Sequence, residues 1–308
     1  MAWVGASFGV SRPTIMRRME GLSKPGTKAG RLQRACLRLL LEHEATGAIP
    51  TSIRFLFYEL LDQGVIPKVY RDKTGAEKKR TPSQDISDAV TVLRELDSHA
   101  IPWGWIVDET RTLEEWRYAE SVQSYVEEVL PVARIDLWGG EPPPLILCES
   151  RSLAGVLRDI AQDYLCPIAA TNGQAGGFLH TEVAPLVAGP GGRRVLYLGD
   201  LDLSGGHIEA NTRTVLEGYG ELEWEKVAIT DVQVQVRESA FPVKTKLDYR
   251  FKPARAFDAV ETEALGQARI MELLKERLEA AVPEPLTEVL RREEQQRVLV
   301  RERLNGGE

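Results

Sequence analysis

The regular alternation of apolar runs and helix-like segments between residues 145 and 229 constrains the fold of this 308-residue chain more than any other feature. Segments with a helical spacing of apolar residues separate four short apolar runs, at residues 145–148, 167–171, 194–198 and 226–229. Strands joined in this way form a parallel sheet with helices on its faces. We therefore predict an α/β domain with a Rossmann-like parallel sheet over residues 144–232, preceded by the turn-rich segment 139–144.

The chain ahead of this sheet has the periodicity of amphipathic helices. The helices expected there cover residues 32–40, 53–61, 83–98 and 113–130. Residues 100–107, after the third helix, are expected to be extended. Three helices followed by a short hairpin are typical of a winged helix, so we predict a mainly α, winged-helix-like DNA-binding domain over residues 31–138. A plain three-helix bundle explains the same pattern.

Charge is distributed unevenly along the chain, although the net charge is −7. Residues 1–90 hold 15 Lys and Arg against 9 Asp and Glu, whereas the remainder holds 24 against 37. This division fits a DNA-holding module joined to a metal-using one. Chance variation in the charge of solvated surface residues is the alternative explanation. Residues 1–30 are expected to form a basic arm or the second half of a helix-turn-helix. The basic side chains expected to contact DNA are Arg12, Arg17, Arg18, Lys78, Lys79 and Arg80.

Two classes of protein are disfavoured by composition. The chain has no run of about 20 apolar residues and no apolar signal segment at its start, so we expect a cytoplasmic protein with no membrane partner. Cys36, Cys148 and Cys166 are odd in number and lack CxxC spacing, so neither a disulfide framework nor a zinc site is expected. All three are interpreted as small buried residues.

Acidic residues follow two of the predicted strands. Glu149 comes directly after residues 145–148, and Asp200 and Asp202 come after residues 194–198. Because ligand sites in parallel sheets form at the carboxyl ends of strands, these side chains are expected to meet. Mg²⁺ is held by one or two protein carboxylates, with water and phosphate oxygens completing its octahedron. The sequence therefore predicts an Mg²⁺ site, which Mn²⁺ could also fill; a generic acidic turn is the alternative for Asp-x-Asp alone.

The combination of these acidic motifs resembles the Toprim domain of topoisomerases, bacterial primases and related nucleases. Cys148-Glu-Ser150 and Leu198-Gly-Asp-Leu-Asp-Leu-Ser-Gly205 match its two motifs, and the second is similar to that of the topoisomerase VI A subunit and its meiotic double-strand-break relatives. The resemblance extends to uncharacterised bacterial and phage proteins that join a winged-helix-like region to this Toprim. It implies that Asp200 and Asp202 hold Mg²⁺, and that Glu149 completes the metal shell or exchanges protons.

Topoisomerase VI A also places a nucleophilic tyrosine in a winged-helix domain ahead of its Toprim. Arg54-Phe-Leu-Phe-Tyr58 has the corresponding Arg-x-x-aromatic-Tyr pattern in the same domain order. The resemblance implies that Tyr58, aided by Arg54, attacks DNA and forms a tyrosyl-DNA ester. Half-buried packing explains the same tyrosine on an amphipathic helix.

The expected function is Mg²⁺-dependent DNA strand breakage of the topoisomerase VI A type. The alternatives are a Toprim nuclease that uses water and a DNA-binding or replication-associated protein that does not cut. The expected partners are DNA, a second copy of the chain and a separate ATPase subunit. Residues 233–308 are expected to form a mostly helical extension, in which Glu261 or Glu263 could add a carboxylate to the metal. His207 is interpreted as a helix residue facing solvent or phosphate.

Overall fold

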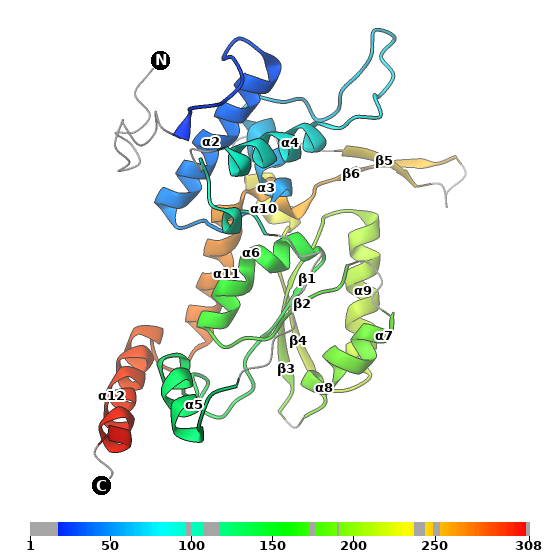
Figure 1. The fold of residues 1–308 in the computed structure, drawn as a ribbon. Coiled ribbons are helices and arrows are strands. Elements are labelled where there is room, and N and C mark those ends of the chain that lie inside the picture. Colours follow the sequence, from blue (N-terminus) through cyan, green and yellow to red (C-terminus); the bar gives the residue numbers. More distant parts are fainter. Residues whose placement is uncertain are drawn as a thin grey trace.

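A computed structural model describes residues 18–96, 100–107, 118–172, 176–189, 191–236, 244–248 and 253–305 of the chain. Figure 1 shows a group of helices from the amino-terminal third above a sheet that is flanked by helices, with the last helix reaching away from the sheet. The expected basic arm, with Arg12 and Arg17, lies outside the described residues.

Three helices form the amino-terminal part. Each begins at a hydroxyl residue whose side chain accepts a hydrogen bond from a backbone N–H of the first turn, which satisfies a donor that the helix leaves free. These helices are α2 (Lys28–Thr46), α3 (Ile53–Asp62) and α4 (Pro82–Glu95). Their apolar faces bury Cys36, Leu40, Leu56 and Leu93 in one core. The three helices predicted from the apolar spacing are thus confirmed.

The predicted parallel sheet is also confirmed. Its strands are β1 (Leu145–Cys148), β2 (Ile168–Ala170), β3 (Arg193–Leu198) and β4 (Leu222–Ala228). They lie in the order β2-β1-β3-β4, and every pair is parallel. The register places Cys148 opposite Leu198, so β1 and β3 end at the same level. The residues that follow these two strands are thereby brought side by side at the carboxyl edge of the sheet.

Helices cover both faces of this sheet because alternate side chains of a strand point to opposite faces. Ile146 and Leu196 face one core, together with α6 (Arg151–Asp163) and α11 (Gln267–Ala281). Leu147 and Tyr197 face the other core. The helices on that side are α7 (Gly176–Phe178), η4 (Leu179–Val183), α8 (Ala184–Val187) and α9 (Leu203–Glu217). All three cysteines are buried, as expected, and they are free thiols.

A hairpin and a short helix after the sheet return the chain to its carboxyl edge. Following α10 (Asp231–Val236), β5 (Lys244–Asp248) and β6 (Arg255–Ala259) form an antiparallel pair that projects from the body in Figure 1. Val260 then pairs with Leu201 through two backbone hydrogen bonds of 2.9 and 3.0 Å. This pairing sets η5 (Thr262–Leu265) beside the residues that follow β3.

Two local predictions were wrong. Residues 103–105 were expected to be extended, but they form a 3₁₀ turn, η2 (Trp103–Trp105). Arg94 donates hydrogen bonds to the carbonyls of Trp103 and Ile106, so a tertiary contact overrides the local preference. The helix expected over residues 113–130 begins only at Val122 in α5 (Val122–Val129), where Ser121 is the cap. Residues 108–117 lie outside the described part.

Two helices near the carboxyl end confirm the helical character expected there. Besides α11, the chain forms α12 (Leu286–Asn305), which is joined to the segment before β1 by an ion pair of 2.8 Å between Arg134 and Glu293. None of the helices in the described ranges combines the length and the apolar character that crossing a bilayer requires.

Candidate functional site

The carboxyl ends of β1 and β3 bring Glu149 and Asp200 together. Oε2 of Glu149 accepts a hydrogen bond of 2.9 Å from the backbone N–H of Asp200. Oδ1 of Asp200 accepts hydrogen bonds from the backbone N–H and the hydroxyl of Thr262, at 2.8 and 3.0 Å. The two carboxylates are therefore held in place by the backbone of the β3–α9 turn and by η5.

Asp202 caps a helix at the same edge of the sheet. It is the N-cap of α9, and its Oδ1 accepts a hydrogen bond of 2.6 Å from the N–H of Gly205. A Cβ at position 205 would lie 2.5 Å from the carbonyl oxygen of Asp200 and 3.3 Å from Oε2 of Glu149. Only glycine fits there, because α9 starts directly against the two carboxylates.

Arg54 reaches this edge from α3. Its guanidinium lies 3.7 Å from Oδ2 of Asp200 and 3.2 Å from both Oε2 of Glu261 and Oε2 of Glu263. The three carboxylates raise the pKa of Arg54, although burial alone would lower it. The amino-terminal helices thus contribute a permanent positive charge to the site.

Tyr58 lies one helical turn beyond Arg54 but does not open into the same space. Its side chain is only 3 % exposed, packs edge-on against Phe57, and donates a hydrogen bond from its hydroxyl to Glu261. Because Glu261 also pairs with Arg54, the two members of the Arg-x-x-aromatic-Tyr pattern share one carboxylate.

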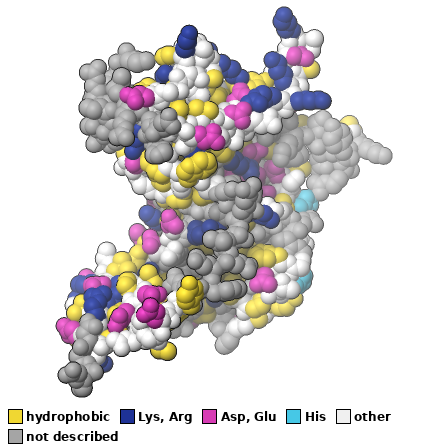
Figure 2. Space-filling model, in the orientation of Figure 1, with side chains coloured by type: hydrophobic (Ala, Val, Ile, Leu, Met, Phe, Trp, Pro, Cys, Tyr) yellow, Lys and Arg dark blue, Asp and Glu magenta, His cyan; other side chains and the backbone are white. Residues whose placement is uncertain are grey.

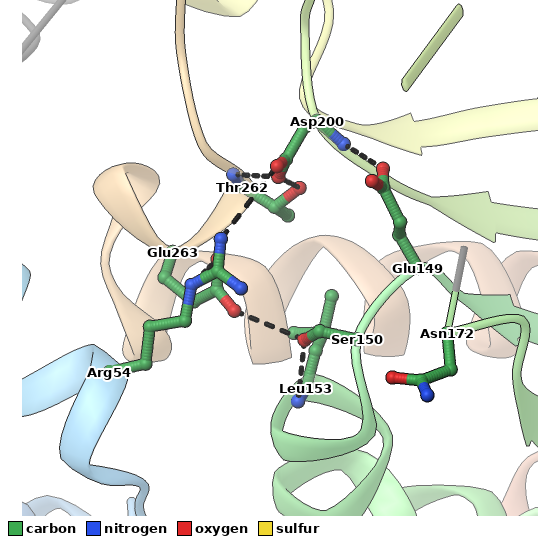
Figure 3. Close-up of a pocket in the computed structure, with 8 residues that line it drawn as sticks. All are labelled: Arg54, Glu149, Ser150, Leu153, Asn172, Asp200, Thr262 and Glu263. Carbon is green, nitrogen blue, oxygen red and sulfur yellow. Dashed lines mark hydrogen bonds and ion pairs between the residues drawn. The ribbon is translucent and has the colours of Figure 1, made fainter. Parts of the chain in front are cut away.

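A cavity of about 150 Å³ lies between these groups (Figure 3). Its lining consists of Arg54, Glu149, Ser150, Leu153, Asn172, Asp200, Thr262 and Glu263. The view shows Arg54 entering from α3 on one side and Asn172 pointing toward the same space from the other. The cavity therefore has acidic walls, one cation and several neutral hydrogen-bonding groups.

Burial and crowding of negative charge alter the proton affinity of two carboxyl groups. Burial, followed by the nearby Asp200 and Asp202 carboxylates, raises the pKa of Glu149. Glu263 is only 1 % exposed, and burial raises its pKa to about 7 even though Arg54 acts in the opposite direction. Glu263 therefore exchanges a proton near neutral pH, and the pKa of Glu149 is shifted in the same direction; perturbed carboxyl groups of this kind suit acid–base chemistry.

The oxygen donors present fit Mg²⁺. In the described part of the chain, no group of three or more His, Cys, Asp or Glu side chains is arranged to hold a metal ion. Mg²⁺, however, commonly takes only one or two protein carboxylates and fills its remaining positions with water and phosphate oxygens. Glu149 and Asp200 supply that number. Burial and then the neighbouring Asp200 and Asp202 carboxylates raise the pKa of Glu149, and a divalent cation would offset the charge part of that shift.

The basic residues expected to contact DNA fall into two groups. Lys78 and Lys79 are exposed on the loop between α3 and α4, which projects from the helices and carries several Lys and Arg side chains (Figure 2). Arg80 is also exposed but forms ion pairs with Asp85 and Asp88, and Arg18 pairs with Glu44 at 3.3 Å. Lys78 and Lys79 are therefore better placed than Arg80 or Arg18 to contact a ligand.

Several residues of the site were not anticipated from the sequence. Ser150 accepts the first-turn hydrogen bond of α6 and donates one of 3.1 Å to Glu263. Asn172 and Thr262 also line the cavity. The position of Ser150 directly after Glu149, ahead of a helical segment, was a usable signal, whereas nothing local marked the other two. His207 lies exposed on α9, as expected.

Comparison of the chain with protein-family models, with curated proteins and with solved structures found no match.

Proposed function

We propose that this chain is a Mg²⁺-dependent enzyme that breaks DNA phosphodiesters at the cavity between Glu149, Asp200 and Arg54. The observation that carries the proposal is the joint placement of two carboxylates, from the ends of adjacent parallel strands, and a guanidinium from α3 around one cavity. Carboxylates of this kind bind a hard cation, and a guanidinium binds phosphate oxygens. The Toprim-type fold suggested by the two acidic motifs is part of the same proposal.

Each residue has a distinct role in this proposal. Mg²⁺, when held by Glu149 and Asp200, supplies positive charge to the phosphate and increases the acidity of water. Arg54 orients the phosphate and neutralises charge that develops on its oxygens. Asp202 fixes the start of α9 and adds negative charge near the cation.

Water is the nucleophile that the geometry supports best. Tyr58 is 3 % exposed and lies outside the lining of the cavity, so its hydroxyl has no open path to a phosphate in this arrangement. In hydrolysis, the oxygen of water forms a bond to phosphorus while one ester P–O bond breaks. Solvent takes the proton of the water, because Glu149 holds the cation, and the departing alkoxide receives a proton from solvent.

Transesterification of the topoisomerase VI A type is the second candidate, and the carboxylate that Tyr58 shares with Arg54 supports it. The tyrosine hydroxyl and Arg54 both bond to Glu261, so Glu261 could take the phenolic proton. The Tyr58 oxygen would then bond to phosphorus, one ester P–O bond would break, and the DNA hydroxyl would leave. This route requires Tyr58 to move out of its packing in the amino-terminal core.

Hydrolysis and transesterification differ in whether the broken DNA carries covalently attached protein. Supercoiled plasmid would be incubated with the chain and Mg²⁺ or Mn²⁺, stopped with detergent, and analysed with and without protease. We expect breaks without attached protein, retained in Tyr58→Phe and lost in Asp200→Asn. Tyr70→Phe is a matched control, because Tyr70 also donates a hydrogen bond to a carboxylate, that of Asp85, from the same part of the chain.

Other outcomes favour the remaining functions. Protein-linked breaks that disappear in Tyr58→Phe would establish transesterification. Tight DNA binding without breaks under either metal would favour a DNA-binding protein that does not cut, and the enzyme proposal would be withdrawn.

DNA and a second copy of the chain are the partners in this proposal. The winged-helix-like amino-terminal part would hold DNA through the loop that carries Lys78 and Lys79. The second copy would pack on α12, whose Val298, Leu299 and Val300 are exposed.

A further inference from the structure

Asn172 lines a side of the cavity that the proposed chemistry leaves unused. It lies two residues beyond the end of β2, and its backbone N–H donates a hydrogen bond of 2.9 Å to the carbonyl of Glu149. Figure 3 shows its amide pointing into the cavity from the side opposite Arg54. A substrate group bound between Glu149 and Arg54 would therefore be within the space that Asn172 faces.

The backbone of Asn172 is unusual for a residue with a side chain. Its φ is +47°, in the left-handed region, and among the described residues other than glycine only Leu165 shares a positive φ. Asparagine tolerates this conformation partly because its amide can bond to the local backbone. Within the part of the chain that the structure describes, however, no residue bonds to the Asn172 amide group. With respect to the described residues, the turn thus presents to the cavity an amide that has no hydrogen-bond partner.

We propose that the side-chain N–H of Asn172 binds a non-bridging oxygen of the scissile phosphate, opposite Arg54. This inference rests on the proposed function and adds a substrate-positioning residue to it. The two donors would hold the phosphate from both sides, with the carboxylates of Glu149 and Asp200 beside it.

The neutrality of the amide suits this position. Glu149, Asp200 and Glu263 make the cavity wall acidic, so a lysine or arginine in place of Asn172 would pair with a carboxylate and compete with a divalent cation. An amide N–H donates to phosphate without such competition. The amide oxygen could instead bind the cation, and substitution by aspartate separates these two roles because it removes the donor but strengthens a metal ligand.

The test compares Asn172→Gly and Asn172→Asp with the unaltered full-length chain. Glycine removes the amide and accepts the positive φ, whereas aspartate keeps the size and tolerates the same φ. Asn211→Ala, an exposed asparagine on α9, serves as the control. Three quantities would be measured: the single-turnover rate of plasmid cleavage with Mg²⁺, the affinity for Mn²⁺ by calorimetry without DNA, and the melting temperature.

We expect Asn172→Gly to lower the cleavage rate by about 10- to 100-fold, the range for loss of one hydrogen bond to a charged group. Its Mn²⁺ affinity and melting temperature should stay close to those of the unaltered chain. Asn172→Asp should cleave more slowly still, because its charge repels the phosphate.

Two results would overturn the inference. One is cleavage by Asn172→Gly at the unaltered rate, which would show that the amide does not act on the substrate. The other is a fall in Mn²⁺ affinity that matches the fall in rate, which would make Asn172 a metal ligand. Failure of the proposed function would give a different result from failure of this inference. In that case the unaltered chain would be as inactive as Asp200→Asn, and the role of Asn172 would be rejected together with the proposed function.

Discussion

Nε of Arg54 lies 3.2 Å from Oε2 of Glu263, a carboxylate that is 1 % exposed. This ion pair joins α3, in the first fifth of the chain, to η5, more than 200 residues later. A buried carboxylate without a cation is costly, so Glu263 and Arg54 are expected to depend on each other.

Removing the guanidinium should have opposite effects on metal binding and on catalysis. Arg54→Ala leaves Asp200, Glu261 and Glu263 without their common cation, so Mn²⁺ affinity should rise about tenfold through uncompensated negative charge. DNA cleavage should fall about 100-fold, because the phosphate loses its positive partner. The free energy of unfolding should fall by about 2 kcal/mol, a figure reduced for the partial exposure of Arg54. Calorimetry, plasmid cleavage and urea titration measure the three quantities.

Arg54→Lys is the matched control. An ammonium group keeps the charge but cannot span three carboxylates as the planar guanidinium does. It should restore Mn²⁺ affinity to the unaltered value and recover only part of the cleavage. Weaker Mn²⁺ binding in Arg54→Ala than in the unaltered chain would contradict the competition between Arg54 and the cation.

The buried carboxyl of Glu263 should make stability depend on pH. Its pKa is about 7 in the folded protein, against 4.5 for an ordinary glutamate, so the folded state binds the proton more tightly. The resulting stabilisation is complete below pH 4.5 and is lost as pH rises through 7. In Glu263→Gln this loss, up to about 3 kcal/mol, should vanish. Urea titrations from pH 4.5 to 8 with a metal chelator measure the slope, and equal slopes for both proteins would disprove the prediction.

Asp85 should give the opposite dependence at acid pH. Burial would raise its pKa, but hydrogen bonds from Lys28, Tyr70 and Arg80 outweigh burial and lower the pKa to about 2. Its contribution is therefore present above about pH 4 and is lost as pH falls toward 2. Asp85→Asn should lower the free energy of unfolding at pH 7 by about 1 to 2 kcal/mol. It should also make the free energy of unfolding depend less on pH below about pH 4.

Asp88→Asn is the control for this prediction. Its side chain is 69 % exposed and, within the described ranges, pairs only with Arg80, so the change should cost less than about 0.5 kcal/mol. A loss as large as that of Asp85→Asn would show that the Arg80 pairs, rather than the three-sided contact of Asp85, stabilise this region.

Lys78 and Lys79 should contribute more to DNA affinity than Arg80. The two lysines are exposed on the projecting loop, whereas Arg80 must give up its pairs with Asp85 and Asp88 to reach a phosphate. Substituting both lysines by alanine should reduce the slope of log affinity against log salt by about 2, and Arg80→Ala should change it by less than 1. Fluorescence anisotropy with a labelled duplex at several salt concentrations measures the slopes, and a larger effect of Arg80→Ala would refute this ranking.

The sequence predicted those parts of the fold that depend on neighbouring residues. The strand at Leu145–Cys148 was located because four apolar residues lie between a proline run and a glutamate, and the placement of Glu149 beside Asp200 followed from parallel strands that end together. Glu263 was named only as a carboxylate that could reach the metal. Its position depends on the pairing of Leu201 with Val260, which local periodicity does not encode.

Local patterns also failed where a distant contact decides the conformation. The apolar character of residues 100–107 favours an extended strand, but Arg94 draws the carbonyls of Trp103 and Ile106 into a turn. The local sequence did not mark Asn172 as a residue of the site, because its position in the cavity depends on how β2 packs beside β1.

The packing of Ile229, Val260 and Ala264 into the core of the amino-terminal helices has a consequence for synthesis. The last of helices α2, α3 and α4 ends at Glu95, which is 134 residues before Ile229 and 169 residues before Ala264. Until residue 264 has emerged, the face of α3 that carries Arg54 lacks part of its apolar cover. The nascent chain therefore completes its first core only after the sheet has been made, so assembly of the cavity and completion of that core come as a single late event.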